Sequence, residues 1–316
     1  PMTAFYTVSG RDFFPGLVAL VNSLRLHGHD EPVYLLDLGL EDWQRRLVSE
    51  EVTLVAAPDD TPPHLAKTHA PLAHPAETAV LIDVDMVVTR PMHELIARAG
   101  EGRVLGFRDR QQRFFPEWGS AFGLGDARPI PYVSSGLLFC GGAEGREVLR
   151  LLAEHQRAVD YSRTFWRAND RGYPFLYADQ DVVNAILATR PDPDRFEALD
   201  ARLASTPPFR RLRVADERAL RCAYPDGEEP YVLHQFVRKP WLEPMYHGPY
   251  SRLLARSLLA GDVAIAVPPE TVPLRMRGGS RARAERTFVN ARDLGRYYLG
   301  DVVPGWIGTR IEDRRR

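Results

Sequence analysis

The sequence predicts an α/β fold in which a mostly parallel central sheet is flanked by helices. Over the first 110 residues, short apolar runs alternate with amphipathic stretches, as in successive strand–helix–strand units. Two carboxylates directly follow one of these runs, at the sheet edge where open α/β sheets bind ligands. The first strand is followed neither by a dinucleotide-binding glycine motif nor by a P-loop. Both of those nucleotide-binding classes are therefore weak candidates.

The N-terminal third is expected to contain four strands and two helices. Apolar runs of strand length occur at 4–8, 32–38, 52–56 and 78–82. Apolar residues recur at helical spacing over 15–27 and 40–50. Residues 63–75 are expected to be partly helical.

The rest of the chain is less regular. Residues 110–131 mix aromatics, Gly and Pro and read as a long surface loop, and loops of that length are usually functional. The further elements expected are strands over 132–139 and 231–236, and helices over 144–160, 179–189 and 244–259. Residues 272–316 contain 11 arginines against 5 acids. We therefore predict one α/β domain over 1–261 and a basic C-terminal extension over 262–316.

Composition excludes several classes of protein. The net charge of −1 lacks the basic footprint of a general nucleic-acid binder. No apolar run approaches the ~18–20 residues that span a bilayer, and the N-terminus lacks the pattern of a secretory signal. The two cysteines, Cys140 and Cys222, are too few for a disulfide framework or a cysteine-rich zinc site. The cytoplasm is the expected location.

The basic residues are strongly biased towards arginine. Of the 41, only Lys67 and Lys239 are lysines. An ammonium is a compact point charge and a guanidinium is a planar fork, so the two are not interchangeable at a tight site. Both lysines are therefore candidates for a chemical role.

Asp83 and Asp85 flank Val84 at the end of the buried run 78–82. Two carboxylates so placed can turn towards one divalent ion, and hard oxygen ligands suit Mg²⁺ or Mn²⁺. Two other Asp-x-Asp pairs occur, at 179–181 and 192–194, so the bare pattern is not specific. Only the first pair follows a buried strand.

His234 ends a short predicted strand and lies five residues before Lys239. The imidazole can supply a third metal ligand, and the ammonium can meet an anionic leaving group. The alternative is a buried structural histidine and a lysine whose stem covers apolar surface.

Two polar segments complete the set. Asp179, Gln180 and Asp181 open a predicted helix, where one acid would suffice as a cap. Ser134, Ser135 and Gly136 interrupt an apolar strand. Small residues there allow a ligand to approach the backbone, or mark a bulge.

In chain order, the sequence has an N-terminal strand and helix, Asp83-Val84-Asp85, Ser135-Gly136, Asp179-Gln180-Asp181, and His234 before Lys239-Pro240-Trp241. This order of motifs resembles that of the family 8 glycosyltransferases, which include glycogenin and the lipopolysaccharide galactosyltransferases. The resemblance covers residues 3–260 approximately. It includes Lys67, which lies 16 residues before Asp83, where glycogenin-like sequences carry a basic residue facing the donor sugar.

The resemblance implies a GT-A fold and a retaining hexosyltransferase that uses Mn²⁺ (or Mg²⁺) and a nucleotide sugar, with UDP as the expected nucleotide. The implied acceptor is a hydroxyl of a glycan, a lipid-linked sugar or a specialised metabolite. The implied metal ligands are Asp83, Asp85 and His234. The residues implied around the base and ribose are Thr7, Val8, Ser9 and Phe13. Those implied at the donor sugar are Lys67, Asp179, Ser134, Ser135 and Gly136. Lys239 would contact the diphosphate, and Val84 also belongs to the implied donor-binding set. Gln180 would lie beneath the anomeric carbon.

Two departures from the family pattern bear on the donor. The family's H-x-x-G-x-x-K-P-W is one residue shorter here, and Val237 stands at the glycine position, so the phosphate loop must be tighter. Ser134 replaces the usual Asn, which indicates a different donor-sugar preference.

An amide such as Gln180 is a poor nucleophile, which favours front-face displacement assisted by the leaving phosphate. Asp179 and Asp181 remain alternatives as nucleophiles or sugar-positioning groups. Candidate aromatic residues for stacking on the acceptor are Phe114, Phe115, Trp118, Trp166, Trp241 and Tyr246. The basic extension is a candidate for docking on anionic lipid or a phosphorylated acceptor, against the alternative of a solvated tail.

Two other function classes stay open from sequence. A sugar-phosphate nucleotidyltransferase shares a similar core but needs a glycine-rich basic loop after the first strand, and residues 9–12 are too short for one. A non-catalytic nucleotide-sugar binding protein would keep the same donor residues without turnover.

Overall fold

Seven strands form one central sheet with the order β3-β2-β1-β4-β7-β6-β8. We describe it from a computed structural model covering residues 2–58, 61–190, 192–245 and 248–300, with the side chains of 63–64 and 292–300 excepted. The strands are β1 (Thr3–Ser9), β2 (Val33–Asp37), β3 (Thr53–Ala56), β4 (Thr78–Ile82), β6 (Val104–Arg108), β7 (Val133–Gly141) and β8 (Phe196–Leu199). Four neighbouring pairs are parallel, and β7 runs antiparallel to β4 and β6. The predicted α/β class with a mostly parallel sheet is confirmed.

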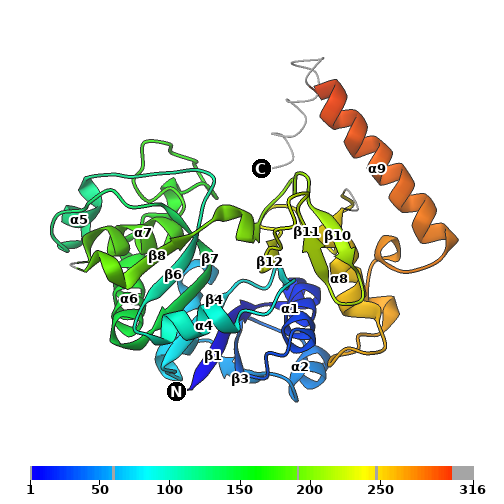
Figure 1. Cartoon of the computed structure of the whole chain (residues 1–316), viewed down its shortest axis with the longest axis horizontal. Helices are drawn as coiled ribbons and strands as arrows, with labels where there is room; N and C mark the ends of the chain where they lie inside the picture. The colour runs from blue at the N-terminus through cyan, green and yellow to red at the C-terminus, as the bar shows by residue number, and fades with distance from the viewer. Residues whose placement is uncertain (1, 59–60, 191, 246–247, 301–316) are drawn as a thin grey trace.

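Helices cover both faces of this sheet because alternate strand residues point to opposite sides. Phe5 and Val80 belong to one buried cluster, and Tyr6 and Leu81 belong to the other. The first cluster lies under α1 (Phe14–Leu26), α4 (His93–Gly100) and α8 (Pro249–Leu259), and the second under α3 (His69–Ala73), α6 (Gly142–His155) and α7 (Asp179–Thr189). In Figure 1, α6 and α7 lie to the left of the sheet, with α1 and α8 to its right.

A small second sheet determines where the site forms. It consists of β5 (Met86–Val88), β12 (Val232–His234) and β9 (Ala204–Ser205), with β12 in the middle. β12 pairs antiparallel with β5 in a register that sets His234 opposite Met86. Two residues that are 148 positions apart in the chain thereby become neighbours. A separate hairpin is formed by β10 (Arg213–Asp216) and β11 (Arg221–Ala223).

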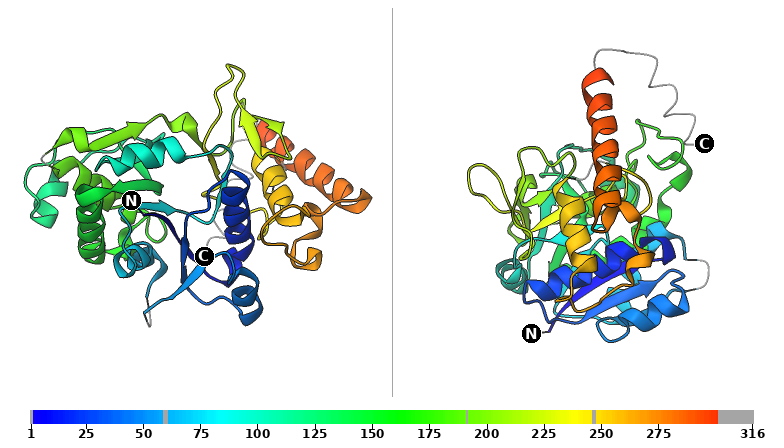
Figure 2. Two further views of the ribbon diagram at one scale, coloured as in Figure 1. Left: turned by 60° about the horizontal axis from the view of Figure 1, so that its bottom comes forward. Right: turned by 90° about the vertical axis from the view of Figure 1, so that its right-hand side faces the viewer.

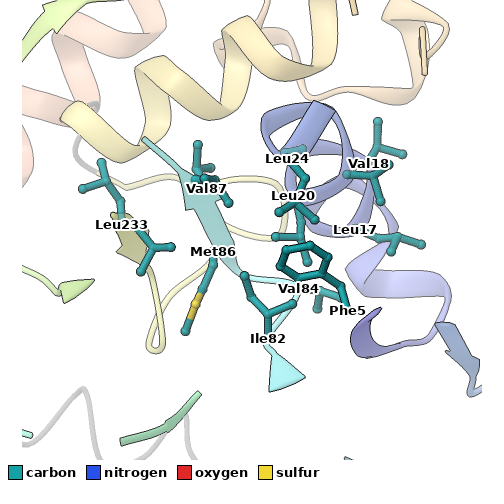
Figure 3. Close-up of a cluster of buried hydrophobic side chains, with 14 of the residues drawn as sticks. Phe5, Leu17, Val18, Leu20, Leu24, Ile82, Val84, Met86, Val87 and Leu233 are labelled. Carbon is teal, nitrogen blue, oxygen red and sulfur yellow. The ribbon is translucent and has the colours of Figure 1, made fainter. Parts of the chain in front are cut away.

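Helix α1 connects the N-terminal strands to the C-terminal part of the chain. Its apolar side packs against Phe5, Ile82 and Val87 (Figure 3). On α1, Asn22 is fully buried. Its amide donates to the carbonyls of Ser257 and Ile265, and its Oδ1 accepts the Ile265 N–H. The start of the predicted extension is therefore attached to the same core.

Beyond that attachment, α9 (Ser280–Gly300) reaches away from the sheet (Figures 1 and 2). No helix among the described residues is long and apolar enough to cross a bilayer. Six of the 11 arginines of the predicted extension lie at 292–316, where the side chains are outside the described part. The domain boundary after residue 261 stays a prediction.

Several elements differ from the sequence prediction. Helix α4 and strands β6 and β8 were not expected. Each is only four to eight residues long, so apolar periodicity over them is weak. The predicted loop 110–131 contains helix α5 (Glu117–Phe122), whose Trp118 is buried. The helix expected over 244–259 begins at Pro249 in the structure, and the helix expected over 144–160 ends at His155.

Candidate active site

The site is built on the turn that leaves β4. All five residues of β4 are buried. The Asp83 N–H then donates to the Gly136 carbonyl at 2.9 Å, and the Met86 N–H donates to the Asp83 carbonyl at 3.2 Å. This turn releases the chain from the main sheet and directs Asp83 and Asp85 to the same side.

His234 reaches these carboxylates through the β5–β12 pairing. Its Nε2 lies 3.2 Å from Asp85 Oδ1 and 4.0 Å from Asp83 Oδ2. One ligand atom from each of the three residues fits within a 4.8 Å cluster. The three predicted metal ligands therefore converge, although His234 lies almost half the chain length away from the other two in sequence.

The donor set fits a divalent ion such as Mn²⁺. Asp85 Oδ1 is buried and accepts no hydrogen bond from any residue in the described ranges. It faces the Nε2 ring nitrogen of His234 at 3.2 Å, and an imidazole nitrogen and a carboxylate oxygen are both metal-ligand atoms. Two carboxylates and one imidazole are ligands of the type that Mn²⁺ takes.

Lys67 holds three groups from three different elements. It comes from the 3₁₀ helix Pro63–Thr68. Its ammonium lies 3.0 Å from Asp83 Oδ1 and 3.1 Å from Asp179 Oδ2, and it donates to the Ser135 carbonyl at 3.1 Å. The structure thus connects this lysine to the predicted metal turn, to α7 and to the small-residue strand.

Lys239 holds the other carboxylate of the pair. Its Nζ lies 2.5 Å from Asp85 Oδ2 and also donates to the Gln235 carbonyl. The side chain is only 6% exposed. The family resemblance implies that this ammonium contacts the diphosphate of the donor. In the structure the ammonium forms an ion pair with Asp85 instead.

The two carboxylates experience opposite electrostatic environments. Burial raises the pKa of Asp83, Lys67 opposes that rise and the charge of Asp85 adds to it, so the pKa is raised. Burial also acts to raise the pKa of Asp85, but the charges of His234 and Lys239 outweigh it and lower the pKa. Burial would lower the pKa of Lys67, yet Asp179 and Asp83 raise it above its ordinary value.

Gly136 is where β7 passes closest to this cluster. A Cβ there would lie 2.7 Å from His234 Cε1, 2.8 Å from Met86 Cε and 3.1 Å from Asp83 Oδ2. Any side chain would displace the predicted ligands. The small-residue segment therefore serves close approach between the strand and the site.

The start of α7 presents Asp179 and Gln180 to the site. Gln180 Oε1 accepts the Ser135 N–H at 3.3 Å, and its amide donates to Asp109 at 3.2 Å. Ala178, just before the helix, has φ of 47°, a conformation that costs a non-glycine residue about 1–3 kcal/mol and is common at functional sites. The helix start is thus held in a strained arrangement.

Asp181 differs from its neighbours because it is fully buried. It accepts from the Tyr132 hydroxyl at 2.7 Å, from Arg113 at 3.1 Å and from the Tyr177 N–H at 2.7 Å. Burial raises its pKa against these donors. With its oxygens occupied and no exposed surface, Asp181 is placed to anchor α7, which argues against the predicted contact with the sugar.

The predicted base pocket lies along the end of β1. Thr7 and Ser9 are buried, and Val8 and Phe13 are half-buried. No described residue hydrogen-bonds the buried Thr7 hydroxyl. Val84 has its side chain in the hydrophobic core (Figure 3), so only its backbone is available to a donor.

Trp241 closes this side of the site. Its indole N–H donates to the Asp12 carbonyl at 2.9 Å, and its ring packs edge-on against Phe13. A Cβ at Gly16 would lie 2.5 Å from the Val84 carbonyl and 2.9 Å from the Trp241 ring. Trp241 is therefore held by the fold on this side of the site, by Asp12, Phe13 and the close approach of Gly16.

The other candidate acceptor aromatics are also placed by the fold. Trp118 is buried and donates to the Pro174 carbonyl at 2.9 Å, whereas Trp166 is 59% exposed. Phe114 and Phe115 are partly buried against Trp118. Tyr246 lies outside the described residues.

The sequence analysis missed Asp109, which the structure joins to Gln180. It follows directly on β6 and lines a groove with Arg108, Gln112, Pro129, Ile130, Pro131, Asp200 and Ala201. A carboxylate at the end of a strand was the available signal, but β6 itself was not predicted.

No family model matches the sequence, and no curated protein resembles it in sequence. Solved structures do resemble it. The galactosyltransferase LgtC, in complex with donor and acceptor sugar analogs, superposes with a TM-score of 0.53 at 15% identity, over 84% of this chain and 98% of its own. The fold is that of the GT-A glycosyltransferases.

Two further glycosyltransferases share this fold. The apo bifunctional glycosyltransferase WbbM has a TM-score of 0.53 at 14% identity, with 82% of this chain and 50% of its own covered. The apo glycosyltransferase GlyE of Streptococcus pneumoniae has a TM-score of 0.50 at 14% identity, with coverage of 82% and 61%. This chain thus spans about half to three fifths of those two. The resemblance predicted from the motifs is confirmed at the level of fold.

Proposed function

We propose that this protein is a metal-dependent retaining glycosyltransferase that moves a hexose from a nucleotide sugar to a hydroxyl acceptor. One observation carries the proposal. Within a GT-A fold, Asp83, Asp85 and His234 converge beside the half-buried Lys67 and the buried Lys239 at the carboxyl edge of the sheet. We propose UDP as the nucleotide and Mn²⁺ (or Mg²⁺) as the ion.

The chemistry follows from charge. In glycosyl transfer, negative charge develops on the departing diphosphate, and a bound divalent ion supplies Lewis-acid stabilisation for it. Lys239 adds a second positive charge in a nearly dry site, and preorganised charge of this kind typically contributes several kcal/mol. Lys67 and Asp179 hold sugar hydroxyls, with Ser134, Ser135 and Gly136 along the sugar.

Gln180 lies beneath the anomeric carbon in this proposal. Its amide is a poor nucleophile, which supports front-face displacement with the leaving phosphate helping to deprotonate the acceptor. Asp179 is the alternative nucleophile, because it is close to Lys67 and only partly buried. We assign Asp181 an anchoring role.

The acceptor is proposed to enter through the groove beside Asp109. Asp109 bonds to Gln180 on one side and lines the groove on the other. Polar lining from Arg108 and Gln112 suits a hydroxylated ligand. The exposed Trp166 is the remaining aromatic candidate for stacking.

We also propose that the protein works in the cytoplasm and that its basic extension contacts an anionic surface. Cys140 and Cys222 are free and buried, which suits a reducing compartment. On α9, Arg281 and Arg283 are exposed, and Phe288 is 71% exposed. Co-sedimentation with anionic but not neutral vesicles, reversed by salt, is expected; equal binding to both would contradict it.

A panel of nucleotide sugars tests the main proposal. Melting temperature is measured with and without Mn²⁺, and diphosphate release is then followed for each donor that binds. We expect one UDP-sugar to raise the melting temperature only with Mn²⁺ and to turn over. Pyrophosphate release from UTP or dTTP would indicate a nucleotidyltransferase instead, and binding without hydrolysis or transfer to any acceptor would indicate a binding protein.

A further inference from the structure

We propose that Lys239 is an internal counter-ion of the metal site, so that the ion and the nucleotide diphosphate bind well only together. In the structure its ammonium lies 2.5 Å from one oxygen of Asp85. When a diphosphate arrives, the ammonium transfers to it and releases Asp85 to the ion. This inference rests on the proposed function and adds to it a coupling between ion binding and nucleotide binding.

The geometry of Asp85 supports a shared carboxylate. Its Oδ2 lies 2.5 Å from Lys239 Nζ, and its Oδ1 lies 3.2 Å from His234 Nε2. One oxygen thus faces the predicted ion, and the other is held by the lysine. Asp85 and Lys239 are both less than a tenth exposed, so water screens the pair weakly.

The charge balance explains why the ion alone would bind weakly. Asp83, Asp85 and Asp179 face two ammonium groups, from Lys67 and Lys239. These three carboxylates and two ammonium groups sum to a charge of about −1, and a divalent ion reverses that sign beside a buried ammonium. Like charges a few ångströms apart repel strongly in a poorly screened site. A nucleoside diphosphate brings the negative charge that both cations can share.

The backbone around Lys239 is held, so only the side chain needs to move. Arg275 donates two hydrogen bonds to the Pro240 carbonyl, at 3.2 and 2.7 Å. Trp241 is fixed to the Asp12 carbonyl and packed over Gly16. A lysine has a flexible four-carbon stem, which lets its ammonium leave Asp85 while Pro240 and Trp241 stay in place.

Lys67 is not built to move in this way. Its ammonium has acceptors on three separate elements, Asp83, Asp179 and the Ser135 carbonyl. Releasing it would break all three contacts. The two lysines therefore have different roles, one as a fixed link and the other as an exchangeable counter-ion.

The test measures binding rather than turnover. Mn²⁺ affinity is determined by electron paramagnetic resonance of free Mn²⁺, with and without saturating UDP, and UDP affinity is determined with and without Mn²⁺. In the wild type we expect each to tighten the other by roughly tenfold or more, and by the same factor because coupling is reciprocal. Lys239→Met should bind Mn²⁺ alone roughly tenfold more tightly than the wild type and should show a smaller coupling factor.

Lys239→Arg is the matched control, because it keeps the charge. Its affinity for Mn²⁺ alone should stay as weak as that of the wild type. Equal Mn²⁺ affinity in the wild type and Lys239→Met would overturn the proposal, as would wild-type Mn²⁺ affinity that UDP does not change. The wild-type measurement stands even if Lys239→Met fails to fold. Absence of UDP binding under every condition would instead refute the proposed function itself.

Discussion

Asp83 and Asp85 lie on one turn and carry the same chemical group, yet their neighbours drive their pKa values in opposite directions. Burial dominates at Asp83 and raises its pKa, while His234 and Lys239 outweigh burial at Asp85. Asp85 is therefore the more readily ionised member of the pair. At Asp83 the nearby Lys67 favours the charged form and opposes burial.

Asp83→Asn should abolish metal-dependent turnover while leaving the fold intact. The amide removes one charged ligand, and loss of a preorganised charged contact at the reacting phosphate typically costs 10²–10³ or more in rate. Donor hydrolysis is measured across a Mn²⁺ titration. Asp194→Asn is the control, since it belongs to an Asp-x-Asp pair in an exposed turn. Wild-type activity in Asp83→Asn would refute the metal assignment.

Thr7→Val tests the base pocket. The Thr7 hydroxyl is buried and has no partner among the residues described, so replacing it with a methyl group should leave stability unchanged or raise it by up to about 1 kcal/mol. If a nucleotide supplies the missing partner, UDP affinity should fall by roughly five- to tenfold, from loss of one hydrogen bond. Calorimetric UDP titration and thermal melting separate the two effects. Unchanged affinity would remove Thr7 from the donor site.

At the scale of elements, strand β7 lies so close to the candidate site that it leaves no space for a side chain at Gly136. Gly136→Ala places a methyl group within 2.7–3.1 Å of His234, Met86 and Asp83. We expect a loss of about 1–3 kcal/mol in stability together with weaker Mn²⁺–UDP binding. Gly278→Ala, where a Cβ meets nothing within 4 Å, should do neither. If Gly136→Ala changed stability and Mn²⁺–UDP binding no more than Gly278→Ala does, the close approach at Gly136 would be unimportant.

Helix α1 depends on one buried polar residue for its link to the C-terminal segment. Asn22→Ala leaves the Ser257 carbonyl and both backbone groups of Ile265 without their partner. Each buried unsatisfied group costs about 1–3 kcal/mol, so the unfolding free energy should fall by at least ~2 kcal/mol. Urea unfolding measures it. A change of a few tenths of a kcal/mol would mean that the segment relaxes or is hydrated.

Over the whole molecule, stability should decline below neutral pH. Burial, with a contribution from His29, lowers the pKa of His27 to about 4, and burial also lowers that of His29. The pKa of a histidine in the unfolded chain is about 6.5, so both imidazoles bind a proton less readily in the folded protein than in the unfolded chain. The stabilisation is present above pH 6.5 and is lost as the pH falls towards 4, by on the order of 2–3 kcal/mol for His27.

Urea unfolding at pH 7.5, 6.5, 5.5 and 4.5 checks this dependence. In the His27→Gln variant the curve should be flatter over the same range, because one group that binds a proton only on unfolding is gone. A wild-type stability that is constant from pH 7.5 to 4.5 would show that both histidines titrate normally in the folded protein.

Much of the architecture was readable because it depends on local pattern. The alternation of strand and helix over the first 82 residues, the position of Asp83 after a buried strand, and the start of α7 at Asp179 all agree with the structure. Short elements with weak apolar periodicity, notably β6 and β8, were not predicted from the sequence. Because β6 was missed, so was Asp109 at its end.

The sequence by itself determined the fold class, the candidate ligands and the special status of the two lysines, because strand-end chemistry and apolar periodicity are properties of neighbouring residues. Only the tertiary structure decided which charges meet. That Asp85 is shared between His234 and Lys239, that Lys67 joins Asp83 to Asp179, and that Asp181 is withdrawn into the core all depend on contacts between distant segments. Register between β5 and β12 and the packing of α7 establish those contacts, and neither is encoded in a local pattern.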